Sequence, residues 1–336
     1  MAVTSAAYHG PGWRVRHGRH EDDIAAGETW APLRVRRESD RLTDIVLHCP
    51  SAALLTSGEP DALQHLERID HAALRRDIEA LAEAYGALGI TVHELPAAEP
   101  PGSTVHDVPA AEPPGRNPYR GANAMYVRDL LWMTGAGAVI PRMASAVRAG
   151  EEMQALRLCA RLGVPVARTI GADGVFEGAD AQWLRSDLVA VGLGARTNAA
   201  GARQVADEAG QQGARVLRLS VPAGIQHLLG VLQVLDTDLL AARTSMMNPA
   251  EVRHLREQGF TVVDIPESDE VRTHLAFNFV TVAPRAVLMP SGSRHTAALL
   301  SRHGVECVAR VPIPELIKGA GGIACATGTL ARTSQD

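Results

Sequence analysis

Cys325 lies in the segment GAGGIACATGTL, residues 319–330, directly after a glycine-rich turn. A cysteine is a strong nucleophile only as the thiolate, and backbone N–H groups freed by Gly321 and Gly322 would stabilise that anion. Alternatively, the turn only requires a small residue at this position. Taken alone, the segment favours this second, structural interpretation, so other residues must supply the rest of a catalytic set.

A carboxylate and a histidine complete such a set elsewhere in the chain. Glu177 lies in GVFEGADAQWL and His227 in VPAGIQHLLGVLQVLD. A thiolate, a general acid/base and an acid that orients the imidazole are the groups that nucleophilic catalysis requires. Each also has a structural interpretation, because a single histidine among apolar residues is more often part of a core. Asp180, close to Glu177, suits a residue that caps a turn.

Further charged residues could bind a charged substrate. Arg128 and Asp129 interrupt the apolar segment NAMYVRDLLWM, so they must either pair with each other or face a polar channel. Arg196 follows a glycine-rich strand end and Arg148 opens a helix, where each could also be a surface or capping residue. Because guanidinium groups bind carboxylates well, the arginines are candidates for holding a substrate carboxylate.

These residues come from different copies of one repeated unit. Five amphipathic helical stretches each end in a glycine that precedes a short β-branched strand; the glycines are Gly89, Gly163, Gly213, Gly259 and Gly304. Apolar residues recur at helical spacing in each stretch, and each glycine suits a left-handed C-cap. Hairpin-like segments such as MYVRDLLWMTGAGAVI lie between the copies, and TDIVLHCPSAALL is a looser first one. The repeated unit is therefore hairpin, helix, strand.

The repeats predict a closed ring of five α/β units around a central channel. The last four glycines are 50, 46 and 45 residues apart, which is the spacing of a structural array. A solenoid would expose its end repeats, and neither end of the chain carries a capping sequence. Loops at one end of such a channel converge, so a site could take one residue from each repeat.

The repeats also set the expected boundaries. A single catalytic domain is predicted at residues 34–331, after an N-terminal extension at 1–33 and before a tail at 332–336. The first interval is longer because TVHELPAAEPPGS is followed at once by TVHDVPAAEPPGR, a tandem near-duplicate. Its proline and alanine content predicts an extended, exposed loop at 91–116.

Composition excludes several classes of function. The net charge of the 336-residue chain is −5 and no basic face stands out, which argues against a nucleic-acid or anionic-membrane partner. There is no apolar run of membrane-spanning length and no signal-peptide core near the N-terminus. The four cysteines, Cys49, Cys159, Cys307 and Cys325, show neither zinc-site spacing nor a disulfide framework. We therefore expect a cytoplasmic protein, with a homodimer as one option for its oligomeric state.

Six segments, in this order and together with the five repeats, resemble the pentein superfamily of guanidine-modifying enzymes; they are MYVRDLLWM, FEGADAQWL, GARTN, QHLLG, FNFVTV and GGIACATG. This superfamily includes arginine deiminases, dimethylargininases and amidinotransferases, and the resemblance covers about residues 40–330. It implies a five-bladed αβ-propeller whose hairpin-helix-strand units surround a central channel. It also implies a small-molecule guanidine substrate, with no cofactor and no metal.

The same resemblance implies a role for each candidate. Cys325 attacks the guanidinium carbon, while His227 protonates the departing amine and then activates the water that cleaves the thiouronium. Glu177 binds the guanidinium or orients His227, and Asp129 grips the guanidinium nitrogens. The other substrate-binding candidates are Arg128, Arg142, Arg148, Asp180 and Arg196, of which Arg196 with Arg148 or Arg142 would take the substrate's carboxylate.

Two departures from the superfamily's pattern bear on the reaction. Arginine deiminases and amidinotransferases carry His-x-Asp where this chain has Leu229, and relatives often have His or Arg where it has Ala324. Because dimethylargininases also lack that Asp, the predicted function is a hydrolase of arginine or an N-substituted arginine-like compound. It would act through a covalent thiouronium and leave a ureido product. An amidinotransferase, and a non-enzymatic binding protein of the same fold, remain alternatives.

Overall fold

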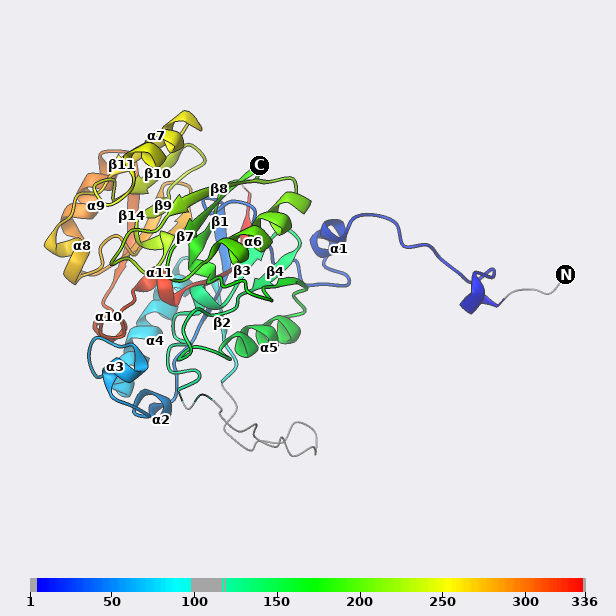
Figure 1. Ribbon diagram of the computed structural model, residues 1–336, viewed down its shortest axis with the longest axis horizontal. Helices are drawn as coiled ribbons and strands as arrows, with labels where there is room; N and C mark the ends of the chain where they lie inside the picture. The colour runs from blue at the N-terminus through cyan, green and yellow to red at the C-terminus, as the bar shows by residue number, and fades with distance from the viewer. Residues whose placement is uncertain (1–4, 98–116, 118, 335–336) are drawn as a thin grey trace.

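The computed structural model describes residues 5–97, 117 and 119–334, and its strands form five separate three-stranded sheets (Figure 1). In each sheet the middle strand pairs antiparallel with one neighbour and parallel with the other. In blade order the strands are β15 (Gly328–Thr333), β1 (Arg41–Leu47) and β2 (Thr91–Glu94); β3 (Trp132–Thr134), β4 (Gly137–Ile140) and β5 (Val166–Thr169); β6 (Ala181–Arg185), β7 (Leu188–Leu193) and β8 (Arg215–Ser220); β9 (Leu232–Val234), β10 (Leu239–Ala242) and β11 (Thr261–Asp264); and β12 (Val280–Ala283), β13 (Ala286–Pro290) and β14 (Glu306–Val311).

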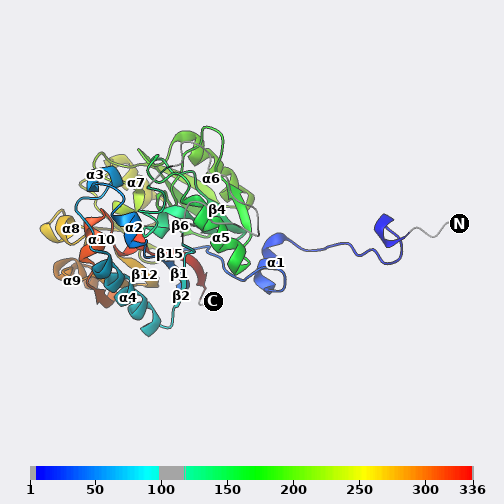
Figure 2. The ribbon, with the colours of Figure 1, turned by 90° about the horizontal axis from the view of Figure 1, so that it is seen from below.

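One long helix precedes the parallel strand of each blade: α4 (His71–Ala87), α5 (Glu152–Leu162), α6 (Ala199–Gln211), α7 (Pro249–Glu257) and α9 (Arg294–Ser301). Figure 2 shows these helices around the rim of the body, with β1, β6 and β15 nearer its middle. All five predicted C-cap glycines have φ between 70° and 90°, in the left-handed region that a side chain disfavours. The glycine stop signals are therefore confirmed in all five blades, and the hairpin-helix-strand unit is confirmed in the four blades after the first.

The ring closes by contacts between consecutive blades. β15 contacts β3, the turn before β6 contacts the turns before β3 and β9, and β1 contacts β12. The Thr281 hydroxyl in β12 donates a hydrogen bond to the carbonyl of Val234 in β9, at 2.5 Å. Between the second and third blades, the Trp132 and Trp183 rings stack with centroids 5.3 Å apart. Interdigitated side chains between blades thus supply the apolar burial that one small sheet cannot.

The first blade differs from its prediction. TDIVLHCPSAALL does not form a hairpin, because β1 ends at Leu47 and the short helix α2 (Ala52–Leu55) follows. The antiparallel partner of β1 is β15, with Leu42 opposite Arg332 and Ile45 opposite Thr329. The last strand of the chain therefore completes the first blade and ties the two ends of the ring together.

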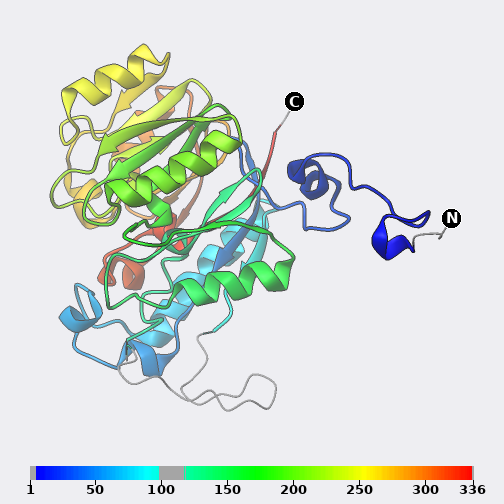
Figure 3. The same ribbon diagram turned by 45° about the vertical axis from the view of Figure 1, so that its right-hand side comes forward.

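Regular secondary structure extends past both predicted boundaries of the catalytic domain. α1 (His20–Ala26) lies in the N-terminal extension, and its Ile24 is fully buried while Glu21 pairs with Arg36 at 2.5 Å. The segment before α1 reaches away from the body (Figures 1 and 3). At the other end β15 continues to Thr333, so the first two tail residues belong to a strand.

Most of the predicted duplicated loop, residues 98–116, lies outside the described residues, whereas 91–94 form β2. Three short helices that no repeat predicted, α3 (Pro60–Leu63), α8 (Asp269–Thr273) and α10 (Pro314–Lys318), lie between the blade elements. Within the described part of the chain, none of the helices combines the length and apolar character needed to cross a bilayer.

Candidate active site

In each blade, the segment before the first strand carries one polar or ionisable side chain that could take part in binding or catalysis. Short helical turns precede four of these strands: η2 (Val127–Leu130), η3 (Gly178–Asp180), η4 (Leu228–Gly230) and α11 (Ile323–Ala326). They bring Asp129, Glu177, His227 and Cys325 to the ring, and the loop before β12 brings Asn278. One position, repeated five times, therefore builds the site.

Glu177 and His227 form the most tightly held pair. Glu177 is fully buried, and its Oε2 lies 2.7 Å from Nε2 of His227. Burial alone would lower the pKa of His227, but the nearby carboxylates, above all Asp129, outweigh it and raise that pKa to about 9. Burial likewise opposes ionisation of Glu177, yet the hydrogen bond and charge of His227 lower the pKa of Glu177 to about 2. At neutral pH the pair is an imidazolium and a carboxylate.

Asp129 interacts with both His227 and the cysteine. It is 3% exposed, and its Oδ2 accepts a short hydrogen bond from Nη1 of Arg148. Its Oδ1 lies 3.8 Å from Nδ1 of His227 and has no hydrogen-bond partner among the described residues. The negative charge of Asp129 also acts on the thiol of Cys325. A buried carboxylate oxygen without a donor, beside a thiol, is where an added N–H donor would be stabilised most.

Asn278 holds the cysteine itself. Its Oδ1 accepts hydrogen bonds from the backbone N–H groups of Ala324, at 2.7 Å, and Cys325, at 3.3 Å. Because two donors face that oxygen, the amide nitrogen must be the atom that faces Sγ of Cys325, 3.1 Å away. No prediction named Asn278, although it lies in the FNFVTV segment at the same place before a blade's first strand as the other four residues.

Cys325 is half-buried, and in the free protein its thiol is neutral. Burial and the charge of Asp129 raise the pKa of Cys325 to about 11, against the opposing effects of the Gly322 backbone N–H and the Asn278 side chain. Close packing is a second reason why glycines occupy this turn, and the sequence did not reveal it. A Cβ on Gly321 would lie 2.3 Å from the ring of Tyr126, and one on Gly322 would lie 2.7 Å from Asn278 Oδ1. The turn is glycine-rich because it packs directly on these two side chains.

Two predicted substrate ligands face other parts of the protein. Arg128 is buried and donates hydrogen bonds to Glu38 at 2.7 Å and to the Thr329 hydroxyl at 3.1 Å, so its partners are these two residues and not Asp129. Successive residues of a tight turn point in different directions, which separates Arg128 from Asp129. Asp180 is also fully engaged, because its Oδ1 accepts from Leu228 N–H and its Oδ2 from the Thr197 hydroxyl.

Asp180 therefore fixes the turn that carries His227. The two hydrogen bonds are short, at 2.8 Å to the Leu228 nitrogen and 2.6 Å to the Thr197 hydroxyl. Burial raises the pKa of Asp180 to about 6, while the charge of His227 opposes this shift.

The three remaining arginines differ in how far their guanidinium groups are already engaged by other groups of the protein. Arg148 is buried and bound to Asp129 and to Glu151, the latter at 2.8 Å, and lies 3.9 Å from Glu177, so its charge is already matched by carboxylates. Arg196 is less buried and touches Glu177 Oε1 at 3.5 Å. Arg142 is exposed and donates to the carbonyl of Gly174. Of the predicted carboxylate ligands, Arg142 and Arg196 are thus the ones with room to turn toward a substrate.

Asp129, Glu177 and His227 are also the one trio of side chains, among those described, whose atoms come close enough to surround a metal ion. Arg148 contacts both carboxylates of this trio, and Arg196 contacts one of them. Their negative charge is therefore already compensated by cations of the protein itself. Leu229 lines an internal cavity together with Ala324, so the position of the absent Asp is occupied by an apolar wall close to the nucleophile loop.

The arginine deiminase family model matches residues 121–257 of the chain, which includes η2, η3 and η4. Among solved structures, DDAH from Pseudomonas aeruginosa in complex with citrulline is 22% identical, with a TM-score of 0.67 over 87% of this chain and 100% of that chain. The inosamine-phosphate amidinotransferase from Streptomyces griseus is 18% identical, with a TM-score of 0.66 over 90% and 97%. An amidinotransferase of saxitoxin biosynthesis from Microseira wollei is 13% identical, with a TM-score of 0.67 over 91% and 99%. The sequence matches no curated protein at a significant level.

Proposed function

We propose that this chain belongs to the pentein superfamily of guanidine-modifying enzymes and hydrolyses the guanidino group of arginine or of an N-substituted arginine-like compound. The observation that carries the proposal is the buried Oδ1 of Asp129, which has no hydrogen-bond donor among the described residues, lies 3.8 Å from Nδ1 of His227 and belongs to a carboxylate whose charge acts on the thiol of Cys325. A guanidinium is a planar cation rich in N–H donors, so it satisfies this oxygen and delivers its central carbon to the sulfur. A ligand without an N–H donor would leave this oxygen without a hydrogen bond.

Binding of the cation starts the chemistry. In the free protein the Cys325 thiol is neutral, since its pKa is raised to about 11. A guanidinium placed against Asp129 cancels the charge that disfavours the thiolate and adds a positive charge next to the sulfur, so the thiol pKa falls when substrate binds. The thiol proton passes to solvent when the cation binds, and the Asn278 amide N–H stabilises the thiolate that remains.

The first half-reaction exchanges nitrogen for sulfur. Sγ of Cys325 adds to the guanidinium carbon, and the tetrahedral adduct then expels ammonia or an alkylamine. His227, protonated at neutral pH, gives its proton to the departing nitrogen, and Glu177 holds the ring through Nε2 so that Nδ1 faces the reacting side. The products of this step are a covalent thiouronium on Cys325, the free amine and a neutral imidazole.

The second half-reaction returns the enzyme to its starting state. Neutral His227 takes a proton from water, and the oxygen adds to the thiouronium carbon. Collapse of this adduct breaks the C–S bond and releases the ureido product, and the proton of the adduct's hydroxyl group returns the sulfur to the neutral thiol while His227 keeps the proton taken from water. Across both steps one water is consumed and one nitrogen is released. Arg142 and Arg196 would hold the substrate's carboxylate at the mouth.

Substrate preference should follow Leu229. An unsubstituted guanidinium would present donors to an apolar wall there, and a buried charge-assisted hydrogen bond that is not made costs about 1.5–3 kcal/mol. An alkylated nitrogen has fewer donors to leave unpaired and gains apolar contact. We therefore expect N-substituted arginines to exceed free arginine in kcat/KM.

The test is a substrate panel followed by product analysis. The purified protein is incubated with arginine, N-alkylated arginines and simpler guanidines, and ureido products and released amines are quantified. In parallel, intact-mass spectrometry searches for a trapped adduct on Cys325, with the Cys325→Ser protein as the control. No turnover and no adduct with any guanidine would refute the proposal.

The amidinotransferase alternative is supported by similarity to two amidinotransferases of this fold. It shares the thiouronium but passes the amidino group to an amine. Repeating the panel with ornithine, lysine or glycine separates the two functions. A new guanidino compound formed at the expense of the ureido product would identify a transferase.

A further inference from the structure

Glu151 is a fully buried carboxylate that the sequence did not single out. It lies at the start of α5, and its main-chain N–H donates to the carbonyl of Arg148 at 3.0 Å, which closes a turn. Gly150 suits this turn, because its φ of 96° lies in the left-handed region that a side chain disfavours. Across the turn, Oε2 of Glu151 accepts a hydrogen bond from Nε of Arg148 at 2.8 Å. Glu151 thus holds a guanidinium group that itself contacts the active site.

Glu151 and Arg148 together hold the chain just before η2. Oε1 of Glu151 accepts from the main-chain N–H of Asn123 at 3.2 Å. Nη2 of Arg148 donates to the carbonyl of Asn123 at 3.3 Å and to that of Tyr126 at 3.5 Å. The segment that leads into Asp129 is therefore fixed at three backbone groups by two side chains from the start of α5.

The remaining nitrogen of Arg148, Nη1, faces the active site. It donates the short hydrogen bond to Oδ2 of Asp129 and lies 3.9 Å from Oε2 of Glu177. This bond fixes the direction of the Asp129 carboxylate and leaves Oδ1 as the oxygen without a donor among the described residues. Burial would lower the pKa of Arg148, but the charges of Glu151 and Asp129 outweigh it and raise that pKa, so Arg148 stays a cation.

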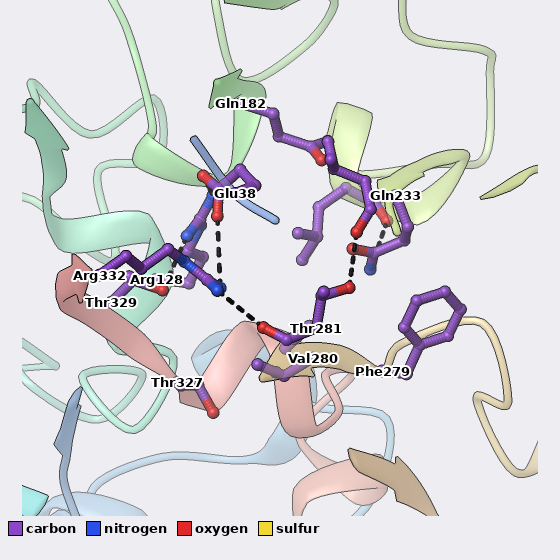
Figure 4. A pocket seen from close by; sticks show the side chains of 13 residues that line it. Glu38, Arg128, Gln182, Gln233, Phe279, Val280, Thr281, Thr327, Thr329 and Arg332 are labelled. Carbon is purple, nitrogen blue, oxygen red and sulfur yellow. Dashed lines mark hydrogen bonds and ion pairs between the residues drawn. The ribbon is translucent and has the colours of Figure 1, made fainter. Parts of the chain in front are cut away.

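Arg128, the sequence neighbour of Asp129, is committed elsewhere. Figure 4 shows it in the wall of an interior cavity, on the same side as Glu38 and Thr329. Glu38 accepts from Nη2 of Arg128 at 2.7 Å. Compensation of the Asp129 charge therefore depends on Arg148, and the position of Arg148 depends on Glu151.

We propose that Glu151 is a positioning residue that acts through Arg148: it directs Oδ1 of Asp129 toward the guanidinium and sets how much of the Asp129 charge reaches Sγ of Cys325. The placement of the guanidinium rests on the proposed function, whereas the effect on the thiol belongs to the free protein. Loss of the Arg148 charge would leave Asp129 uncompensated and disfavour the thiolate. Loss of the Glu151 charge would leave Arg148 more strongly positive and favour it. The two side chains thus act on the thiolate with opposite sign.

Alkylation of Cys325 without substrate tests this opposition. The parent, Arg148→Gln and Glu151→Gln proteins are treated with iodoacetamide at a fixed pH of about 8.5, near the pKa of a free thiol, and Cys325 is followed by mass spectrometry. A nearby charge shifts a pKa by about 1 unit or more. After the compensating change in nucleophilicity, a shift of about 1 unit alters the rate about 3-fold. We expect Arg148→Gln to react about 3-fold more slowly than the parent and Glu151→Gln about 3-fold faster.

A purely structural role would give a different pattern. If both substitutions only loosened the nucleophile loop, they would expose the thiol and accelerate alkylation alike. Acceleration in both proteins, or an unchanged rate in either, would overturn the proposal. If Arg148→Gln does not fold, the pH–rate profile of Glu151→Gln decides. A midpoint at lower pH than in the parent supports the proposal, and faster alkylation at an unchanged midpoint refutes it.

Two further variants serve as controls. Arg148→Lys keeps the positive charge and should bring the rate back toward that of the parent. Arg128→Gln removes a buried arginine next to Asp129 in sequence, but one whose charge is engaged by Glu38, and should react at close to the parent rate. Slowing in Arg128→Gln equal to that in Arg148→Gln would contradict the proposal. Opposite shifts in alkylation, together with no turnover of any guanidine by the parent, would refute the proposed function and still support the role of Glu151.

Discussion

Replacing Asn278 by Asp should selectively disable the thiolate of Cys325. Aspartate keeps an oxygen to accept the two backbone N–H groups of the nucleophile loop but replaces the amide donor, 3.1 Å from Sγ, by a second acceptor. A hydrogen bond to a charged group contributes about 1.5–3 kcal/mol. At 1.36 kcal/mol for each tenfold change, its loss raises the thiol pKa by about 1–2 pH units and lowers the thiolate population about 10–150-fold.

The assay is alkylation of Cys325 by iodoacetamide at a fixed pH of about 8.5, followed site by site with mass spectrometry. A more basic thiolate is intrinsically more reactive, with a Brønsted coefficient of about 0.4–0.5, so the observed rate should fall about 4–15-fold. The added negative charge makes this a lower bound. Because no substrate is involved, the result does not depend on the proposed reaction.

Asn248→Asp is the matched control. Asn248 caps the exposed start of α7, where aspartate caps equally well, so this change should leave alkylation of Cys325 unaltered. Asn278→Asp should also lower kcat/KM for any guanidine that turns over, while the melting temperature changes little. Alkylation of the Asn278→Asp protein at the parent rate would show that Asn278 does not stabilise the thiolate.

Three further changes test other parts of the site. Cys325→Ser should abolish turnover and the covalent adduct while the melting temperature stays close to the parent's, because a half-buried serine fits the same turn; retained turnover would assign the chemistry to another group. His227 has a folded-state pKa of about 9 against 6.5 in the unfolded chain, so its contribution to stability is complete below pH 6.5 and is lost as pH rises through 9. The melting temperature should fall over that interval, and a pH scan of His227→Gln should show a shallower fall. Gly321→Ala places a methyl group 2.3 Å from the Tyr126 ring and should lower both stability and activity, and Tyr126→Leu should partly restore stability if that overlap is the cause.

Local sequence patterns were sufficient to predict the repeated unit of this protein. Gly89, Gly163, Gly213, Gly259 and Gly304 all adopt the left-handed conformation expected at helix ends. That conformation depends on the absence of a side chain, which is a property of the residue itself. Repetition of the unit then led to a ring and to the expectation that its loops converge.

The same local reasoning could not choose between interaction partners. Arg128 and Asp129 are adjacent in sequence, yet Arg128 pairs with Glu38 and Asp129 with Arg148. The two alternatives considered for them, a mutual ion pair or a shared channel, both assumed that neighbours in sequence remain neighbours in space. The direction of each side chain depends on the η2 turn and on the blades around it.

Asn278 shows the remaining limit most clearly. Its segment was recognised, but an asparagine before a strand has many ordinary uses in turns, and nothing local distinguishes it. Its role arises because the fifth blade and the last strand of the chain are brought together when the ring closes, 47 residues apart in sequence. The sequence by itself determined which residues could perform chemistry and the unit that repeats. Only the tertiary structure decided which of them meet, because that depends on how five blades pack around a common axis.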